Sequence, residues 1–137
     1  MKKAVRKTAV RKTAPVAAAS EPSAIPPSYV TCVRAAEEKK GLHIRVLDLR
    51  PVTSFADFFV LCTGNNQRQN QAICDEVLRT MKDRGENANS LEGYQNAEWI
   101  LIDYGDLVMH IFDAKSRGYY DLDRLWRDAP EIAVPRA

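Results

Sequence analysis

The sequence feature that most constrains the fold is an unbroken apolar run, Phe58-Phe-Val-Leu-Cys62. A strand with one face in water alternates apolar and polar residues, but this run offers no polar residue to solvent. It must therefore be covered on both faces, so we expect it in the middle of a sheet. The following Thr63-Gly-Asn-Asn66 is typical of a loop and predicts where the strand ends.

Two segments, 29–40 and 67–84, have the periodicity of amphipathic helices. Their regularly spaced apolar positions are Val30, Val33 and Ala36 in the first segment and Ile73, Val77 and Met81 in the second. A glycine follows each of them, Gly41 or Gly85, and glycine favours the end of a helix.

Three further segments have the composition of strands. Ile44–Leu49 ends before Pro51, and the segments 99–102 and 107–112 flank Asp103-Tyr-Gly-Asp106, which predicts an antiparallel hairpin. The charged segment 113–128 predicts one or two short helices. We therefore expect one α/β domain with a mixed, roughly five-stranded sheet flanked by helices.

A period of two gives the hairpin two apolar faces. The pattern places Trp99, Leu101 and Asp103 on one face of the first strand, and Leu107, Met109 and Ile111 on one face of the second. We expect Trp99, Leu101, Met109 and Ile111 to form one shared face that meets a partner. On this interpretation His110 and Phe112 lie on the opposite face, in the core.

Size and composition limit the class of protein. The 137 residues, 45% hydrophobic and 28% charged, suffice for one core. No apolar run approaches the roughly 18 residues of a membrane span, and the three cysteines have no CxxC spacing, which fits a reducing compartment. These features predict a cytoplasmic protein with no membrane partner.

Residues 1–27 differ from the rest of the chain. They include six basic residues and one acidic residue, and Val5-Arg-Lys-Thr-Ala9 is repeated at once as Val10-Arg-Lys-Thr-Ala14. Low complexity and few large apolar residues predict a disordered basic arm, for which contact with RNA phosphates is one role. The alternative is an organelle-targeting leader, although a five-residue period does not make an amphipathic helix.

The residues of a catalytic or metal site do not come together in the sequence. His43 and His110 lack neighbouring ligands at metal-binding spacing, and a Cys62–His110 pair would fall inside predicted strands. Thr63-Gly64 is weak evidence for a phosphate-binding turn, and Asp121 and Asp123 point apart if they lie in a helix. We therefore expect no enzyme activity, no cofactor, no metal and no small-molecule substrate.

Several motifs occur in a fixed order between residues 29 and 128. They are Asp48-Leu-Arg50, Ser54-Phe-Ala-Asp-Phe-Phe-Val-Leu-Cys-Thr-Gly64, Glu92-Gly93, Glu98-Trp-Ile-Leu-Ile-Asp-Tyr-Gly-Asp-Leu-Val-Met-His-Ile-Phe112 and Ser116-Arg-Gly-Tyr-Tyr-Asp-Leu-Asp-Arg-Leu-Trp126. Together they resemble the ribosomal silencing factor family, also called the iojap-like family. The departures from its pattern, Asn65-Asn66, Met109 and Gly118, affect single contacts only.

The resemblance implies a nucleotidyltransferase-like topology without catalytic residues. It also implies a protein that binds the large ribosomal subunit through that subunit's fourteenth protein and sterically blocks joining of the small subunit. Such binding would repress translation under nutrient limitation and is linked to late large-subunit biogenesis. The alternative of another class is a nucleotidyltransferase-like enzyme that uses Thr63-Gly64 to bind a nucleotide.

The segment 98–123, with six acidic and two basic residues, is our predicted docking region. The candidate partner-binding residues are Trp99, Leu101, Asp103, Asp106, Met109 and Ile111. Trp99 is the expected centre, since interface hot spots are commonly aromatic. The same face is also the expected interface of a homodimer when the protein is not bound to the ribosome. We place the domain at 28–128, with a C-terminal tail at 129–137.

Overall fold

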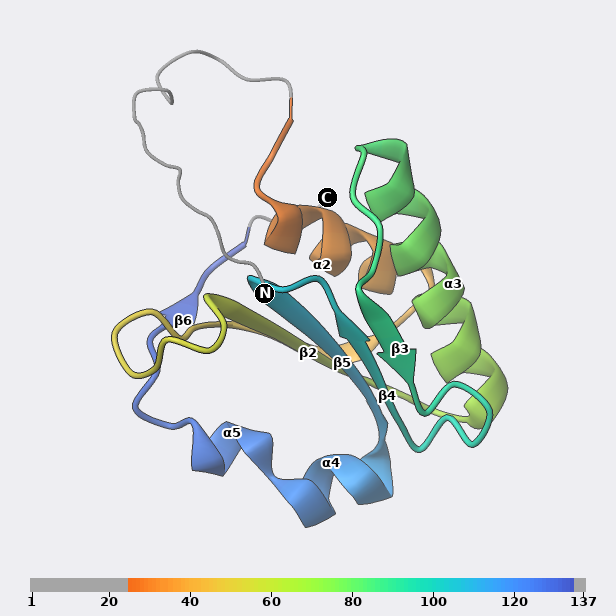
Figure 1. Cartoon of the computed structure of the whole chain (residues 1–137). Helices are drawn as coiled ribbons and strands as arrows, with labels where there is room; N and C mark the ends of the chain where they lie inside the picture. Colours follow the sequence, from red (N-terminus) through yellow and green to blue (C-terminus); the bar gives the residue numbers. More distant parts are fainter. Residues whose placement is uncertain (1–24, 135–137) are drawn as a thin grey trace.

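Six strands form one mixed sheet within residues 25–134, the part of the chain that this computed structural model describes (Figure 1). The strands are β1 (Leu42–Asp48), β2 (Phe58–Gly64), β3 (Ser90–Glu92), β4 (Trp99–Asp103), β5 (Leu107–Asp113) and β6 (Glu131–Ile132). Their order across the sheet is β3-β4-β5-β2-β1-β6, with β2 and β5 parallel and all other neighbours antiparallel. The predicted mixed α/β fold is confirmed.

The apolar run 58–62 lies in β2, between β5 and β1, as predicted. Two helices, α2 (Ser28–Glu38) and α3 (Gln67–Asp83), cover one face of the sheet, and in Figure 1 α2 lies above the sheet and α3 to its right. The main core lies between these helices and the sheet, and Ile73, Val77 and Met81 of α3 are fully buried there. The amphipathic pattern of 67–84 therefore identified the buried face of α3 correctly.

Asn66 determines where α3 begins. Its backbone is extended, and its side-chain Oδ1 accepts a hydrogen bond of 2.8 Å from the backbone N–H of Gln69. This is the standard N-cap interaction, which satisfies one of the N–H groups that have no partner within the helix. The Asn65-Asn66 departure from the family pattern therefore supplies a functioning cap.

Two short helices, α4 (Ala114–Tyr120) and α5 (Leu122–Leu125), lie on the other face of the sheet (Figure 1). They confirm the expectation for 113–128. Beneath them is a second cluster that includes Leu61, Phe112 and Leu122. These helices span 11 residues against the 28 of α2 and α3, so this face is less completely covered. No helix within residues 25–134 is long and apolar enough to cross a membrane.

The sequence pattern missed two strands at the edges of the sheet. All three residues of β3 are exposed, so no apolar alternation marks it. The two residues of β6 lie beyond 128, where we ended the domain, and pair with β1 through Val46–Ile132 and Leu47–Glu131. Residues 1–24 of the expected arm and residues 135–137 of the tail lie outside the described residues.

Gly93 turns the chain from β3 toward β4. Its φ is +80°, and a Cβ atom there would lie 2.1 Å from the carbonyl oxygen of Trp99. An L-residue would therefore meet both backbone strain and a clash with main-chain atoms. Gly118, within α4, would place a Cβ atom in open space.

These two glycines predict opposite effects of the same substitution. Gly93→Ala should lower the free energy of unfolding by about 2 kcal/mol or more because the backbone cannot relax. Gly118→Ala should raise it by about 0.5–1 kcal/mol because alanine favours the helix. Urea unfolding of the two variants measures both effects, and equal unfolding midpoints would contradict the assignment of the turn.

Candidate functional site

The register of the β4–β5 hairpin determines which side chains share a face. Opposed residues in an antiparallel pair point to the same side of a sheet. The opposed pairs on the α4–α5 side are Trp99–Phe112, Leu101–His110 and Asp103–Val108. On the α2–α3 side they are Ile100–Ile111 and Ile102–Met109.

Our assignment of Met109 and Ile111 to the face of Trp99 was therefore wrong. Both are fully buried in the core under α2 and α3, and His110 and Phe112 share the face of Trp99 instead. Alternation along each strand was correct, but it does not show how two strands pair. A one-residue difference in register moves every side chain of a strand to the other face.

Trp99 is the centre of an aromatic cluster on the α4–α5 side. Its ring is stacked on Phe112 with centroids 5.2 Å apart, and the ring of Tyr120 lies 4.5 Å away. Its Nε1–H donates a hydrogen bond of 3.1 Å to Nδ1 of His110. These contacts fix the orientation of the half-buried indole, so one part of it is held at the surface.

His110 is buried and neutral. Burial lowers the pKa of its imidazole to about 3, with a smaller contribution from the positive charge of Arg117. Because Trp99 can only donate, Nδ1 must accept, which places the imidazole proton on Nε2. Nε2 has no hydrogen-bond partner among the described residues, and an unsatisfied buried donor costs about 1–3 kcal/mol.

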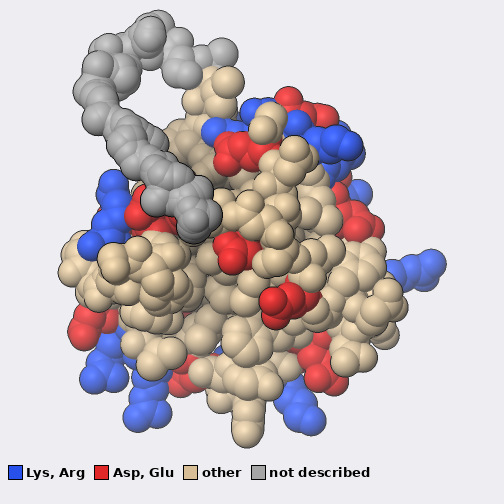
Figure 2. All heavy atoms as spheres, in the orientation of Figure 1, with Lys and Arg blue, Asp and Glu red and all other residues tan. Residues whose placement is uncertain are grey.

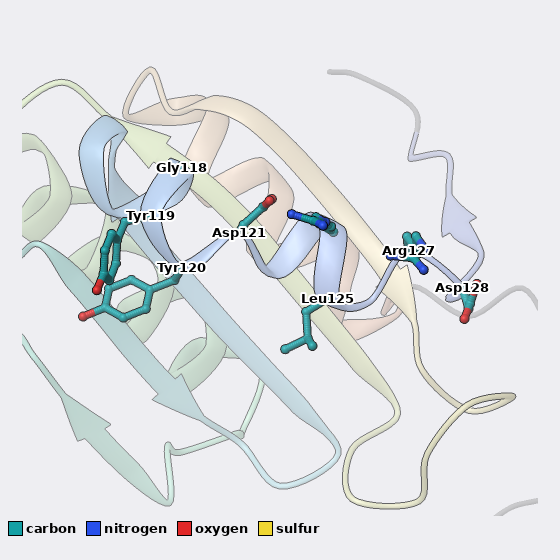
Figure 3. A pocket seen from close by; sticks show the side chains of 8 residues that line it. Gly118, Tyr119, Tyr120, Asp121, Leu125, Arg127 and Asp128 are labelled. Carbon is teal, nitrogen blue, oxygen red and sulfur yellow. The ribbon is translucent and has the colours of Figure 1, made fainter.

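Large apolar side chains remain exposed around this cluster. Phe55 is 59% exposed, Tyr119 80% and Leu125 67%. Figure 3 shows Tyr119 and Tyr120 side by side at the end of α4, with Leu125 projecting from α5. In the same segment Trp126 packs against the sheet, with its ring edge-on to Phe59, and Tyr120 contacts Trp99, whereas Leu125 is exposed.

Carboxylates lie around this face, with Asp103 and Asp106 at the β4–β5 turn, Glu92 in β3 and Glu98 just before β4. Asp103 is half-buried, and its Oδ1 accepts a 2.7 Å hydrogen bond from the backbone N–H of Gly105, while Asp106, Glu92 and Glu98 are exposed. In the view of Figure 2, Asp and Glu side chains lie both across the middle and at the outline, and Lys and Arg lie mostly at the outline. The face of Trp99 is apolar and aromatic, and these carboxylates form an acidic rim.

A hollow of about 350 Å³ opens beside the acidic residues. Phe55, Phe59, Leu101, Asp103, Val108 and His110 contribute to its lining. Four of these residues come from β4 and β5 and the two phenylalanines from the chain around β2, so the hollow continues the face of Trp99 toward the hairpin turn.

An ion-pair network attaches α4 and α5 to the sheet. The Arg117 guanidinium donates to both carboxylate oxygens of Asp123, at 2.8 and 3.0 Å, and to Oγ1 of Thr63 at 2.9 Å. Arg45 of β1 also donates to Asp123, at 2.6 Å, and to Glu131. No local pattern predicts this network, because Arg45 and Thr63 are far along the chain from Arg117 and Asp123.

The residues that were candidates for catalysis, metal binding or phosphate binding have structural roles instead. Asp121 adopts a left-handed conformation between α4 and α5, and Asp123 is paired with arginines. Cys62 and His110 lie on opposite faces of the sheet, and burial raises the pKa of the Cys62 thiol to about 12. A Cβ atom at Gly64 would meet the side chain of Asn70 at 1.9 Å, so Asn70 fills the space beside this turn.

Comparison with known proteins identifies the family. A family model described as "Ribosomal silencing factor during starvation" matches residues 22–137. The chain belongs to this ribosomal silencing factor family. The factor named RsfS from Halalkalibacterium halodurans is 41% identical over 102 residues, covering 74% of this chain and 87% of that protein. Chloroplastic Iojap of Zea mays is 33% identical, covering 77% of this chain and 46% of that protein.

Solved structures of relatives have the same fold. A crystal structure of a protein from Chromobacterium violaceum matches with a TM-score of 0.72 and 33% identity, covering 80% of this chain and 92% of that one. A structure from Bacillus halodurans matches with a TM-score of 0.67 and 36% identity, covering 76% and 94%. The sequence resemblance to ribosomal silencing factors is thus confirmed.

The Arg117–Asp123 network predicts a specific loss of stability in acid. Hydrogen bonds from Arg117, then Arg45, lower the pKa of the Asp123 carboxyl to about 2 from an ordinary value of 3.8. A depressed folded-state pKa stabilises the protein above the unfolded-state pKa, and that contribution is lost as pH falls from about 4 to about 2. Asp123→Asn should therefore cost about 2 kcal/mol at pH 7 and progressively less below pH 4.

Urea unfolding at pH 7 and near pH 3 measures this difference. The matched control is Asp128→Asn, because Asp128 is exposed and has no ion pair among residues 25–134. Its effect should be small at both pH values. If Asp123→Asn were as mild as Asp128→Asn at pH 7, the network would not hold α4 and α5 in place.

Proposed function

We propose that this protein binds the large ribosomal subunit through its fourteenth protein and sterically blocks joining of the small subunit. The result is repression of translation under nutrient limitation, with a further role in late large-subunit biogenesis. Membership of the ribosomal silencing factor family supports the ribosomal target. The observation on which the site depends is the incompletely covered aromatic face with its acidic rim.

The proposed docking residues are Trp99, Leu101, Asp103 and Asp106, together with the exposed Phe55. Trp99 and Leu101 are half-buried on the same face, and Phe55 borders the hollow beside Leu101. A partly exposed aromatic group held by packing contributes contact area at low entropic cost. Met109 and Ile111 are excluded because neither has surface available to a partner.

Electrostatics support a basic protein as the target. Outside residues 1–27 the chain has 17 acidic and 14 basic residues, and Asp103, Asp106, Glu92 and Glu98 lie around the proposed site. Proteins that contact ribosomal RNA are commonly basic, and opposite potentials raise the rate of association. The acidic rim would also oppose docking of the same face on bare RNA.

The mechanism requires no bond to be broken. A bound protein that occupies the subunit-joining surface acts by excluded volume, so repression should follow occupancy. The same apolar face is available for self-association in the free protein, and a homodimer formed in this way would compete with docking. We propose a cytoplasmic location for this activity, in keeping with the bacterial relatives.

Truncation of side chains on the aromatic face should weaken binding to large subunits. Trp99→Ala should lower affinity by about 30-fold or more, and Leu101→Ala by about fivefold, because both remove contact area at the centre of the site. The matched control is Leu91→Ala, since Leu91 is an exposed leucine of β3 that pairs with Ile102 and so lies on the α2–α3 side of the sheet. Co-sedimentation with purified large subunits measures binding, and circular dichroism verifies that each variant is folded.

Subunit joining provides the direct functional test. In sucrose gradients, saturating protein should leave separate large and small subunits where untreated samples form whole ribosomes. Folded Trp99→Ala protein should permit joining at the same concentration. Normal formation of ribosomes in the presence of bound wild-type protein would refute steric exclusion, and lack of any binding would refute the ribosomal target.

A further inference from the structure

His110 has one ring nitrogen for which the described residues provide no partner. Its Nδ1 accepts from Trp99, which lies toward one end of the face. The two nitrogens of an imidazole point in nearly opposite directions, so Nε2–H is directed away from Trp99. The hollow lies on the side of His110 away from Trp99, toward the hairpin turn, because Leu101, Asp103 and Val108 line it and Trp99 does not.

The side chains around Nε2 exclude solvent from it. The ring of Phe59 lies edge-on to the imidazole with centroids 4.5 Å apart, and His110 is 3% exposed. Phe55 forms an outer wall of the hollow and is 59% exposed, so its ring can be displaced at low packing cost. Displacement of Phe55 would give a slender group access to the donor.

The surroundings of the hollow restrict the chemistry of that group. It must accept a hydrogen bond from Nε2–H, which excludes lysine and arginine because they only donate. It must also lie near the Asp103 carboxylate, which repels an acidic side chain. A neutral side chain that both accepts and donates, an amide or a hydroxyl, satisfies both conditions between apolar walls.

We propose that His110 is a specificity-determining residue of the docking face. On docking, an amide or hydroxyl side chain of the ribosomal protein enters the hollow beside Phe55 and accepts a hydrogen bond from Nε2–H. Trp99 then has a second role, because its own hydrogen bond fixes the imidazole tautomer that makes Nε2 the donor. This inference rests on the proposed function and adds to it the chemistry of the recognised group.

A pair of substitutions separates this role from a structural one. In His110→Gln the longer amide can accept from Trp99 and still donate toward the hollow. In His110→Asn the shorter amide retains an acceptor for Trp99 but does not reach the hollow. We expect His110→Asn to bind large subunits about tenfold more weakly than wild type and His110→Gln to stay within about threefold.

Equilibrium co-sedimentation with purified large subunits measures these affinities, and urea unfolding shows whether each variant is stable. If Asn and Gln variants of equal stability bind equally well, the inference is overturned while the proposed function stands. If wild-type protein does not bind, the proposed function itself fails. The measurement is repeated with the isolated fourteenth protein, and a loss seen only with intact subunits would show that RNA, not protein, enters the hollow.

A second variant tests the hollow without altering the buried histidine. Asn89 is exposed on the rim of the hollow, so Asn89→Trp should fill the opening and leave the core intact. We expect at least a tenfold loss of affinity for large subunits, with Asn89→Ala close to wild type. Unchanged binding by folded Asn89→Trp protein would show that nothing enters the hollow.

Discussion

The structure depends on burial of the parallel pair β2 and β5 on both faces. Every residue from Phe59 to Gly64 and from Leu107 to Phe112 is buried, so the centre of the sheet requires cover above and below. α2 and α3 meet this requirement fully on one side. On the other side α4 and α5 cover only part of the face, because the Arg117–Asp123 network holds them over one portion. The remainder is covered by the chain's own aromatic side chains.

The sequence was most informative where one short pattern determines the outcome. The apolar run 58–62 predicted a central strand, the period of 67–84 predicted α3 and its buried face, and the turn at 103–106 predicted the hairpin. Hairpin register was not predictable in this way, because both faces of these strands are apolar and the pattern does not show which faces of the two strands are shared. Consequently Trp99 and Leu101 were placed on a common face correctly, and Met109 and Ile111 were not.

Other parts of the site are not marked by any local sequence pattern. β3 and β6 have two or three residues each and form because a neighbouring strand offers a free edge. Arg45, Arg117 and Asp123 come from three separate elements, so only the folded chain shows that they meet. The hydrogen bond between Trp99 and His110 depends on the register itself, and therefore the chemistry of the docking face could not be derived before the pairing was known.

The unpartnered Nε2–H of His110 lowers the stability of the free protein, and so does the incomplete cover of this face. Both features have the same explanation. A longer α4–α5 segment could bury Phe55, Tyr119 and Leu125, and an acceptor of the chain placed beside Nε2 of His110 would satisfy the unpartnered donor. Both changes would stabilise the free protein by ordinary burial and hydrogen-bond rules. Both would also remove groups that a partner can contact, namely the exposed apolar side chains and the free Nε2–H donor. Interactions that form only in the complex add to the affinity for the partner and not to the stability of the free protein. A binding face is therefore expected to be less well packed in the free protein than burial alone would favour.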